Sequence, residues 1–346
     1  MTGRRLRVVQ WATGNIGTRA LREVIRHPQL DLVGVLVYDD AKAGTDAGEL
    51  CGEAPAGIAA TTEAAAIHAL DADCVLYMPR ATDLDDVTAF LRAGTNIVTT
   101  RDEFFGHGAG LDAEQRTRVL DACKQGNTSI FPSGSSPGFI TDALPFALLS
   151  LQRHVDAIQI EEFADLSQRD SPHLLFEIMG FGKPPESYDA RRAQYLVHSF
   201  GPALTELAEA AGRPVNQWSA TGEVAIARNT TQLAAGELKQ GTIAAQRTTI
   251  VGHAGDDVVV TFSPTWYCTA DTEPEWELQS TGWRVRVRGE APLDVRLEFP
   301  IPVADLGAFT PAYTANRPVN AITYVCAAPP GILSARDLPP ITPAGA

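Results

Sequence analysis

The chain has 346 residues, of which 45% are hydrophobic, and it carries a formal net charge of −14 at pH 7. A chain of this length can bury a substantial core and form about two domains. Its acidic residues are scattered along the sequence, and such a surface repels nucleic acid and anionic lipid. Composition and charge therefore argue against nucleic-acid binding and favour neutral or cationic small molecules as substrates.

The chain contains no apolar run that approaches the ~18 residues of a membrane span, and its N-terminus lacks the order of a signal peptide. The five cysteines are Cys51, Cys74, Cys123, Cys268 and Cys326. They are widely separated and form no C-x-x-C pair, which argues against a disulfide framework and a zinc site. We therefore expect a cytoplasmic protein, with no membrane partner and with buried thiols.

The first 26 residues hold a strand, a tight turn and a helix. The apolar strand 6–10 runs into Ala12-Thr13-Gly14-Asn15-Ile16-Gly17, and an amphipathic helix, 18–26, follows. This order presents backbone N–H groups at a helix N-terminus, where they can hold the pyrophosphate of a dinucleotide. We therefore predict that residues 12–17 bind NAD or NADP.

The turn departs from the usual glycine fingerprint at its first position, which Ala12 occupies. Gly14 stands where a side chain would meet the pyrophosphate, and Gly17 stands where the helix packs closely on the strand. Because glycine also serves ordinary turns, a structural turn without a ligand is the alternative.

A second apolar strand, 32–37, ends at Tyr38-Asp39-Asp40, so that Asp39 follows Gly17 by 22 residues. An acid at roughly this offset binds the adenosine ribose hydroxyls, and the alternative is a solvated turn. A carboxylate at Asp39 repels a 2′-phosphate and favours NAD. Lys42 lies close enough in sequence to moderate that preference, so the sequence allows either NAD or NADP as the cofactor.

Strands and helices continue to alternate up to residue 132. The further expected strands are 74–78, 96–100 and 128–132, and the further expected helices are 84–93 and 113–125. This alternation predicts an α/β domain with a doubly wound parallel sheet of the Rossmann type, whose ligand lies beyond the carboxyl ends of the strands. Pro79 stands at one such strand end and is a candidate cofactor-binding residue.

The segment Ser135-Ser136-Pro137-Gly138-Phe139 follows the last of these strands and is expected to open a helix, 140–149. Proline suits the first turn of a helix, whose N–H groups could meet the carboxamide of the cofactor or the substrate. Ser136, Pro137 and Gly138 are therefore candidate cofactor-binding residues, and a plain helix start is the alternative.

After about residue 150 the pattern changes to the strict alternation of half-buried strands. In the stretch 283–288, Trp283, Val285 and Val287 share one face and three arginines share the other. The stretches 158–163, 248–251, 258–262 and 295–299 are similar. They predict a second, α+β domain with a mostly antiparallel sheet, which serves substrate binding and dimerisation.

We place the dinucleotide-binding domain at residues 1–145 and the second domain at residues 146–312. The stretch 319–328 is compatible with a helix that returns to the first domain, in which case residues 313–346 complete that domain.

Five motifs spread over almost the whole chain carry a family resemblance. They are Gln10-Trp11-Ala12-Thr13-Gly14-Asn15-Ile16-Gly17, Gly44-Thr45-Asp46-Ala47-Gly48-Glu49-Leu50, Ser136-Pro137-Gly138-Phe139, Met179-Gly180-Phe181-Gly182 and Val319-Asn320-Ala321-Ile322. The chain resembles the dihydrodipicolinate-reductase-like proteins, and within them most closely the native amine dehydrogenases and the 2,4-diaminopentanoate dehydrogenases. The resemblance implies an NAD(P)-dependent homodimer that interconverts an amine with a ketone or aldehyde plus ammonia.

The sequence departs from this superfamily at two places. True dihydrodipicolinate reductases carry paired histidines and a lysine early in the second domain, and the corresponding stretch here, 161–166, has neither. Ser136 stands where many relatives have asparagine. The first departure argues against a role in lysine biosynthesis.

Amine oxidation calls for a carboxylate at the mouth of the site, because it attracts ammonium, stabilises an iminium cation and accepts a proton. Glu103 follows a predicted strand, and the resemblance implies a catalytic glutamate at this place. We predict that Glu103 is catalytic and that Phe104 and Phe105 desolvate it, with Asp102 as the second choice. The alternative is that Glu103 only balances the charge of Arg101 in a surface loop.

Four apolar residues are candidates for the substrate pocket: Phe139, Phe176, Met179 and Phe181. Such residues also serve as ordinary core, which is the alternative. His173 and Glu177 are spaced as a helix surface pair, and no third metal ligand accompanies them, so we expect no metal site.

The resemblance and these residues predict an amine dehydrogenase that makes an amine from a small ketone or aldehyde and ammonia, or oxidises that amine in the reverse direction. We expect the amine to lack an α-carboxylate. A second hypothesis is a reductase of a cyclic imine or enamine acid that binds its carboxylate on the arginine-lined strand. A third is a noncatalytic NAD(P)H sensor or scaffold.

Overall fold

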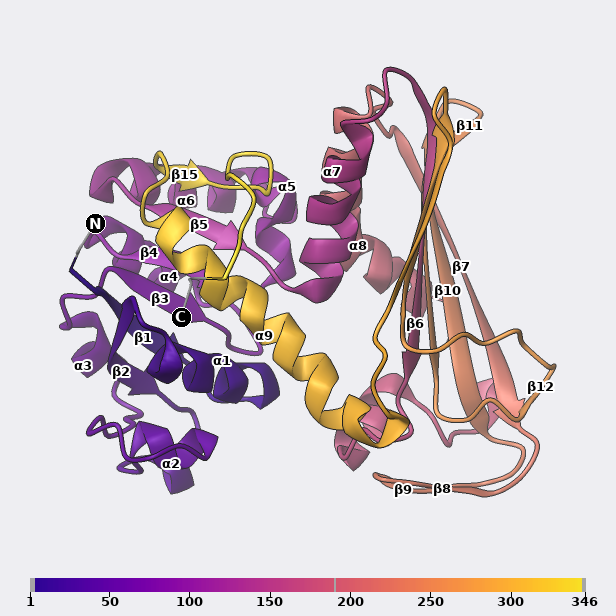
Figure 1. Ribbon diagram of the computed structural model, residues 1–346, viewed down its shortest axis with the longest axis horizontal. Helices are drawn as coiled ribbons and strands as arrows, with labels where there is room; N and C mark the ends of the chain where they lie inside the picture. The colour runs from indigo at the N-terminus through magenta and orange to yellow at the C-terminus, as the bar shows by residue number, and fades with distance from the viewer. Residues whose placement is uncertain (1–3, 190, 344–346) are drawn as a thin grey trace. The chain divides into compact units, whose positions relative to one another are not determined.

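The computed structural model describes residues 4–189 and 191–343, and the chain divides into two compact units (Figure 1). The first unit combines Met1–Phe139 with Pro311–Ala346, and the second comprises Ile140–Thr310. Each unit has a sheet of its own and is described separately.

The first unit is built on a parallel sheet of six strands, in the order β15-β5-β4-β3-β1-β2. The strands are β1 (Leu6–Trp11), β2 (Leu30–Leu36), β3 (Cys74–Tyr77), β4 (Asn96–Thr99), β5 (Ser129–Pro132) and β15 (Gly331–Ile332). Since β2 and β3 lie on opposite sides of β1, the strand order reverses there, and a ligand crevice is expected beyond the carboxyl ends of β1 and β3.

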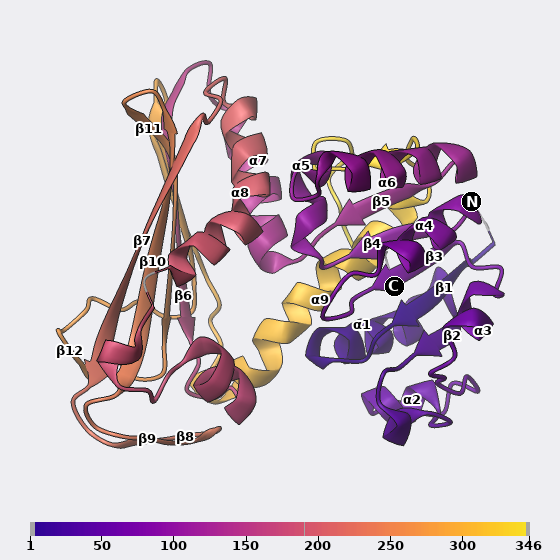
Figure 2. The same ribbon diagram turned by 180° about the vertical axis from the view of Figure 1, so that it is seen from behind.

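Helices cover both faces of this sheet (Figures 1 and 2). The helices of this unit are α1 (Asn15–Arg26), α2 (Ala47–Cys51), α3 (Ala64–His68), α4 (Leu84–Arg92), α5 (Phe105–Gly108), α6 (Ala113–Gly126) and most of α9 (Leu306–Val325). Side chains of α3, α4 and α6 pack with those of β1, β3, β4 and β5 in one core cluster. Side chains of α1 and α9 pack with the opposite face in another. The prediction of a doubly wound parallel sheet is confirmed.

The helix α9 brings the C-terminal part of the chain back to the first unit. Ala315, Val319 and Ile322 are at most 2% exposed and share a core cluster with β1 residues and α1 residues. The helix covers Leu306–Val325, whereas the sequence indicated a helix only over 319–328. Pro311 and Pro318 lie inside it, where proline disfavours a helix.

The second unit is built on a seven-stranded sheet in the order β12-β7-β10-β11-β6-β13-β14. Its strands are β6 (Val155–Asp165), β7 (Gln217–Ala227), β10 (Ile243–Ala254), β11 (Asp257–Tyr267), β12 (Thr272–Glu273), β13 (Gly282–Gly289) and β14 (Leu293–Glu298), beside a hairpin of β8 (Thr231–Leu233) and β9 (Gly236–Leu238). All neighbours in this sheet are antiparallel except β6 and β11. The mostly antiparallel sheet is therefore confirmed.

The two faces of this sheet differ in polarity. The unit contains the helices α7 (Leu144–Leu149) and α8 (Arg192–Ala210), and Phe200 of α8 stacks on Phe262 of β11 with ring centroids 4.5 Å apart. Register places Val285 of β13 on the same face as Phe262, and Val285 is buried. The arginines of β13 alternate with it and occupy the opposite face, as predicted.

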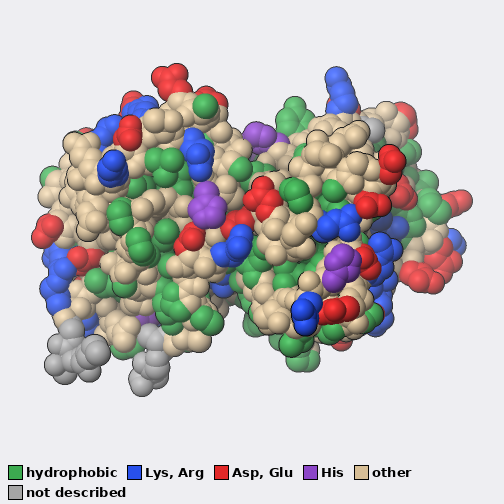
Figure 3. Space-filling model, turned by 90° about the horizontal axis from the view of Figure 1, so that it is seen from above, with side chains coloured by type: hydrophobic (Ala, Val, Ile, Leu, Met, Phe, Trp, Pro, Cys, Tyr) green, Lys and Arg blue, Asp and Glu red, His purple; other side chains and the backbone are tan. Residues whose placement is uncertain are grey.

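Within the described part of the chain, no helix is long and apolar enough to cross a membrane. The five cysteines are free thiols, and four are buried as expected, whereas Cys326 is only half-buried. Cys326 lies just after the end of α9, where its thiol donates to the backbone of Asp73. On the face shown in Figure 3, acidic and basic side chains are interspersed.

Candidate functional site

Ala12 begins the turn between β1 and the N-terminus of α1 in an unusual backbone conformation. Its φ is +77°, in the left-handed region that favours glycine. The N–H of Ala12 donates to Leu36 O (3.0 Å), and the side-chain amide of Gln10 donates to Ala12 O (2.9 Å). These two bonds hold the alanine where the first glycine of a dinucleotide fingerprint would stand.

Gly14 and Gly17 meet the two demands that the sequence assigned to them. A Cβ on Gly17 would lie 2.1 Å from Ala12 O, so only glycine lets α1 pack this closely on the turn. A Cβ on Gly14 would have no atom of the described residues within 4 Å. Gly14 and Asn15 are exposed at the start of α1, so the backbone there is open to a ligand.

Lys42 lies beside this turn rather than beside the acid at the end of β2. Its Nζ donates to Thr13 O at 3.0 Å, and Thr18 Oγ1 donates to the same oxygen at 3.0 Å. Asp39 is exposed and accepts a hydrogen bond from Ala41 N at 3.0 Å, at the start of the short helix Asp40–Lys42. The structure thus brings Lys42 to residues 12–17 and leaves the Asp39 carboxylate at the surface.

The segment after β5 corrects one prediction. Pro137 has φ −68° and ψ 163°, an extended conformation, so it does not stand in the first turn of a helix. Proline pushes the preceding residue away from helical angles, and Ser136 is extended as well. Gly138 follows with φ +124°, which only glycine adopts readily. After Gly138 the chain turns helical, as predicted for residues 140–149: it forms π-helical turns up to Ala143 and continues as α7 from Leu144.

Two hydroxyl groups in this segment have unused hydrogen-bonding capacity. Ser133 Oγ and Ser136 Oγ are buried, and neither has a partner among the residues described. Because buried polar groups are normally hydrogen-bonded, this pair fits an amide-bearing ligand at the carboxyl end of β5. Together with the open backbone at Gly14, these hydroxyls fit a nicotinamide dinucleotide. Pro79, the other strand-end candidate, is buried just after β3.

Glu103 lies in the short helix Asp102–Phe104, which follows the carboxyl end of β4. Its side chain is 15% exposed. Thr82 Oγ1 donates to Glu103 Oε1, and the Arg101 guanidinium lies 3.2 Å from Glu103 Oε2. Arg101 also donates to Thr82 Oγ1 (3.0 Å) and to Arg80 O (3.0 Å). The carboxylate is therefore held in one orientation by a hydroxyl and a guanidinium.

The two phenylalanines that follow Glu103 are both buried. Phe104 is fully buried in the core cluster of the sheet, and the Phe105 ring lies 3.8 Å from the Cβ position of Gly138. The recorded partners of Glu103 are polar, so its surroundings are set by Arg101 and Thr82. Asp102 lies 3.7 Å from the same guanidinium and is farther from it than Glu103 is.

Sequence reasoning missed Thr82 and Ser133 as members of this site. Each is a hydroxyl residue shortly after a strand, Thr82 after β3 and Ser133 after β5. Because the carboxyl ends of parallel strands share one edge of the sheet, a polar residue at such an end was the available signal.

The four candidate pocket residues fall in different parts of the chain. Phe181 is fully buried at the centre of a core cluster of the second unit, where Phe176 and Met179 pack against its edge. Phe139 belongs to the first unit, and the Arg317 guanidinium lies 6.0 Å from its ring centroid. Phe181 therefore serves as core in this structure, and a ligand-binding role for the others stays a prediction.

The arginine-lined face of the second sheet carries a cavity of about 510 Å³. Arg284 pairs with Asp294, Arg286 pairs with Glu161 at 2.8 Å, and the Arg247 guanidinium stacks 4.5 Å from the Trp276 ring centroid. Since carboxylates of the chain itself neutralise Arg284 and Arg286, this face offers little attraction to the carboxylate of an imine acid.

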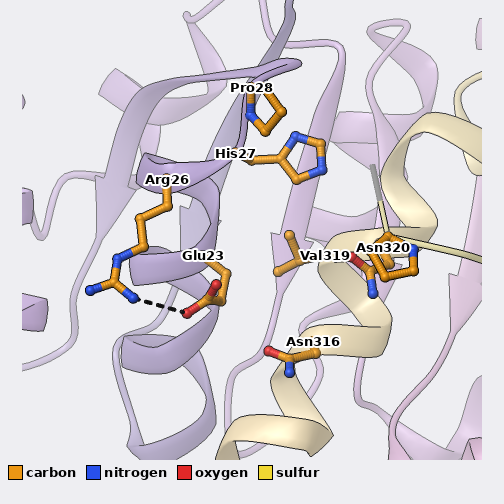
Figure 4. Close-up of a pocket in the computed structure, with 8 residues that line it drawn as sticks. Glu23, Arg26, His27, Pro28, Asn316, Val319 and Asn320 are labelled. Atoms are coloured by element: carbon orange, nitrogen blue, oxygen red, sulfur yellow. Dashed lines mark ion pairs between the residues drawn. The ribbon is translucent and has the colours of Figure 1, made fainter. Parts of the chain in front are cut away.

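A smaller cavity of about 270 Å³ lies between α1 and α9 (Figure 4). Glu23, Arg26 and His27 line it from the carboxyl end of α1, and Asn316 and Asn320 line it from α9. Partial burial lowers the pKa of His27 below its ordinary value. The cavity is at the opposite end of α1 from the turn 12–17, which is the predicted dinucleotide site.

Residues 4–189 and 191–343 contain no group of three or more potential metal ligands among His, Cys, Asp and Glu. His173 opens the short helix His173–Met179, which also contains Glu177. The roles predicted for Glu103 and for the turn 12–17 stay predictions.

Known proteins resemble this chain in sequence and in fold. The chain is 29% identical over 345 residues to an amine dehydrogenase of Streptomyces virginiae, with 96% of this chain and 95% of that protein covered. The structure of an amine dehydrogenase from Mycobacterium smegmatis superposes with a TM-score of 0.78 at 17% identity, over 97% of each chain. GenD2 from gentamicin A biosynthesis, solved in complex with NAD, has a TM-score of 0.54 at 15% identity, over 97% of this chain and 91% of that one.

The family model of the 2,4-diaminopentanoate dehydrogenase C-terminal domain matches residues 139–344, which is more than half of the chain. The resemblance that the sequence motifs indicated is thereby confirmed. The chain belongs to the 2,4-diaminopentanoate dehydrogenase family.

Proposed function

We propose that the protein is an NAD(P)-dependent amine dehydrogenase that converts a small ketone or aldehyde and ammonia into an amine, and catalyses the reverse reaction. The observation that carries this proposal is Glu103, a carboxylate held at the carboxyl edge of the sheet that bears the dinucleotide turn. The relative from Streptomyces virginiae, itself named an amine dehydrogenase, matches over almost the full length and supports it.

The residues that hold the cofactor are proposed to be those of the turn 12–17, together with Asp39, Lys42, Pro79 and the segment 136–138. Bound there, the nicotinamide supplies or accepts the hydride. The exposed Asp39 carboxylate favours an unphosphorylated ribose, and Lys42 donates to Thr13 instead of neutralising it. NAD is therefore the proposed preference, and GenD2, a structural neighbour, was solved with NAD.

Glu103 is proposed to bind the substrate nitrogen and to move its protons. In the oxidative direction the carboxylate takes a proton from the ammonium, so that the nitrogen lone pair can form the C=N bond as the hydride leaves. Once this proton has passed to solvent, the carboxylate stabilises the iminium cation and accepts a proton from the water that attacks it. Return of that proton to the nitrogen lets ammonia leave and gives the carbonyl compound. Arg101 and Thr82 fix the carboxylate for these steps.

We further propose a small amine without an α-carboxylate as the substrate, because Arg101, the arginine beside Glu103, is engaged by Glu103, Thr82 and Arg80 O. A reducing compartment such as the cytoplasm suits the five free thiols.

The test is Glu103→Gln, which keeps the size of the side chain and removes its charge. We expect kcat for ammonia-dependent oxidation of NADH to fall by about 10²- to 10⁴-fold, because proton transfer is lost. The dissociation constant of NADH is expected to stay within about two-fold, since Glu103 does not hold the cofactor. Absorbance of the reduced nicotinamide and fluorescence titration give the two readings.

Asp102→Asn is the matched control, because it removes a neighbouring carboxylate of the same short helix. Full activity of the Glu103 variant together with an inactive Asp102 variant would transfer the role to Asp102. Turnover of a cyclic imine without ammonia, with none on any carbonyl, would instead support the imine reductase.

A further inference from the structure

A buried carboxylate in the second unit has no role in the proposed reaction. Glu162 lies on β6 and is only 8% exposed. Register aligns it with Pro264 of β11 and Trp283 of β13, so its side chain is on the sheet face that Phe262 shares. Glu161, its neighbour in sequence, is on the opposite face with the arginines.

Both oxygens of Glu162 accept hydrogen bonds from indoles. Trp266 Nε1 donates to Oε1 at 2.8 Å, and Trp283 Nε1 donates to Oε2 at 2.9 Å. A carboxylate has about four lone-pair sites, so about two stay open. Both donors are neutral and come from the strands on either side of β6.

Glu162 has no cationic partner in the described part of the chain, where no Lys, Arg or His nitrogen lies within 4.0 Å of it. Glu161 differs, because Arg286 lies 2.8 Å and Arg284 4.0 Å from its carboxylate. A buried ion without an opposite charge is costly to the fold. A cation supplied from outside would remove that cost.

The two indoles that hold the carboxylate pack among other aromatic and apolar side chains. The ring of Trp283 meets Phe299 edge to face at 5.4 Å between centroids, and Phe299 meets Phe309 at 5.7 Å. Trp266 packs at the edge of the same core cluster as Phe176 and Met179. Aromatic faces attract ammonium groups, and apolar neighbours favour a ligand that also has a carbon chain over a bare inorganic ion.

We propose that Glu162, Trp266 and Trp283 form a binding site in the second unit for the ammonium group of an organic amine. The ammonium donates to the open lone pairs of Glu162, while the indoles orient the carboxylate and contribute their rings. This binding does not depend on the proposed reductive amination. The ammonium belongs either to the substrate itself or to a separate amine.

The direct test is a titration of isotope-labelled protein with n-butylammonium, read from the indole N–H signals of its five tryptophans. Trp266→Phe and Trp283→Phe assign the two signals of interest. We expect those two signals to shift with n-butylammonium and to stay in place with 1-butanol, its neutral isostere. No shift in the wild-type protein, or an equal response to 1-butanol or ammonium chloride, would overturn the proposal.

Glu162→Gln removes the charge, and Glu161→Gln removes the same charge from the opposite face as a matched control. We expect the first variant to weaken n-butylammonium binding about ten-fold or more, and the second to leave it within about two-fold. Equal binding by both variants would contradict the site. If Glu162→Gln does not fold, Trp283→Phe decides, because it keeps the carboxylate and removes one of the two indoles that hold it: weakened binding supports the site, and unchanged binding contradicts it.

Turnover of 4-amino-2-butanone and of 2-pentanone, its uncharged isostere, distinguishes the two sources of the ammonium. A rise in KM for the amino ketone alone in Glu162→Gln assigns the site to the substrate. The site is assigned to a separate amine if the KM values do not change and n-butylammonium alters the turnover of 2-pentanone by the wild-type protein but not by Glu162→Gln. If the protein turns over neither ketone, the proposed amine dehydrogenase activity is contradicted, whereas the titration still tests the ammonium site by itself.

Discussion

Ala12 holds a backbone conformation that an L-residue adopts at a cost. At φ +77° its Cβ is crowded by the backbone, and glycine would relieve that crowding. We expect Ala12→Gly to raise the free energy of unfolding by up to about 1 kcal/mol, in spite of the greater freedom of glycine in the unfolded chain. Urea unfolding measures this change.

The control for this prediction is Ala66→Gly, at an exposed position of α3, where helical angles suit alanine. It is expected to lower the free energy of unfolding by about 1 kcal/mol. If both variants lowered the free energy of unfolding by a similar amount, Ala12 would not be strained.

For single residues, the sequence predicted the positions of candidate site residues better than the side chains that contact them. The spacing of Ala12, Gly14 and Gly17 indicated a dinucleotide turn, and the space around the two glycines agrees with it. The contact between Glu103 and Thr82 joins residues 21 positions apart on different strand ends, and no local pattern encodes such a contact. Phe104 looked like a neighbour of the acid because the sequence does not show that its ring enters the core.

Among the elements, α2 depends on one capping residue. Asp46 accepts hydrogen bonds from Gly48 N (2.7 Å), Ala56 N (2.8 Å) and Gly57 N (2.8 Å), and so joins the helix to the loop after it. The N–H of Ala56, followed by those of Gly48 and Gly57, holds the pKa of Asp46 below its ordinary value of 3.8.

Because its pKa is lowered in the folded state, Asp46 stabilises the fold above pH 3.8, and this contribution is lost as the pH falls through the lowered value. We expect Asp46→Asn to lower Tm by a few degrees at pH 7, roughly as for other lost caps. The difference from wild type should shrink in acid. Asp31→Asn, which removes an exposed partner of Arg5, is the control and should change Tm little. A pH-independent difference would show that the charge is unimportant.

Helices were harder to predict in the second half of the chain than strands. The alternation of buried and exposed residues identified β13, because period-two burial is visible in a short stretch. The helix α8 contains Pro202, and α9 contains Pro311 and Pro318, so a local pattern of helix breakers obscured both. Packing of α9 on the first sheet outweighs the cost of these prolines.

For the molecule as a whole, the resemblance implies a homodimer, and we expect one in solution. Light scattering coupled to size exclusion should then give about twice the chain mass of 37.0 kDa. A dilution series serves as the control, since a stable dimer keeps its mass over the range measured. A mass of one chain at every concentration would contradict this expectation.

The return of α9 and β15 to the first unit has a consequence for how the protein is made. The ribosome releases residues 4–139 first, but one face of their sheet lacks the side chains of α9, and β5 lacks β15 as its neighbour. Those parts are translated after the whole second unit. The first unit is thus expected to finish folding only after residues 140–310 have been made, and until then its open apolar face is a surface for chaperones to cover.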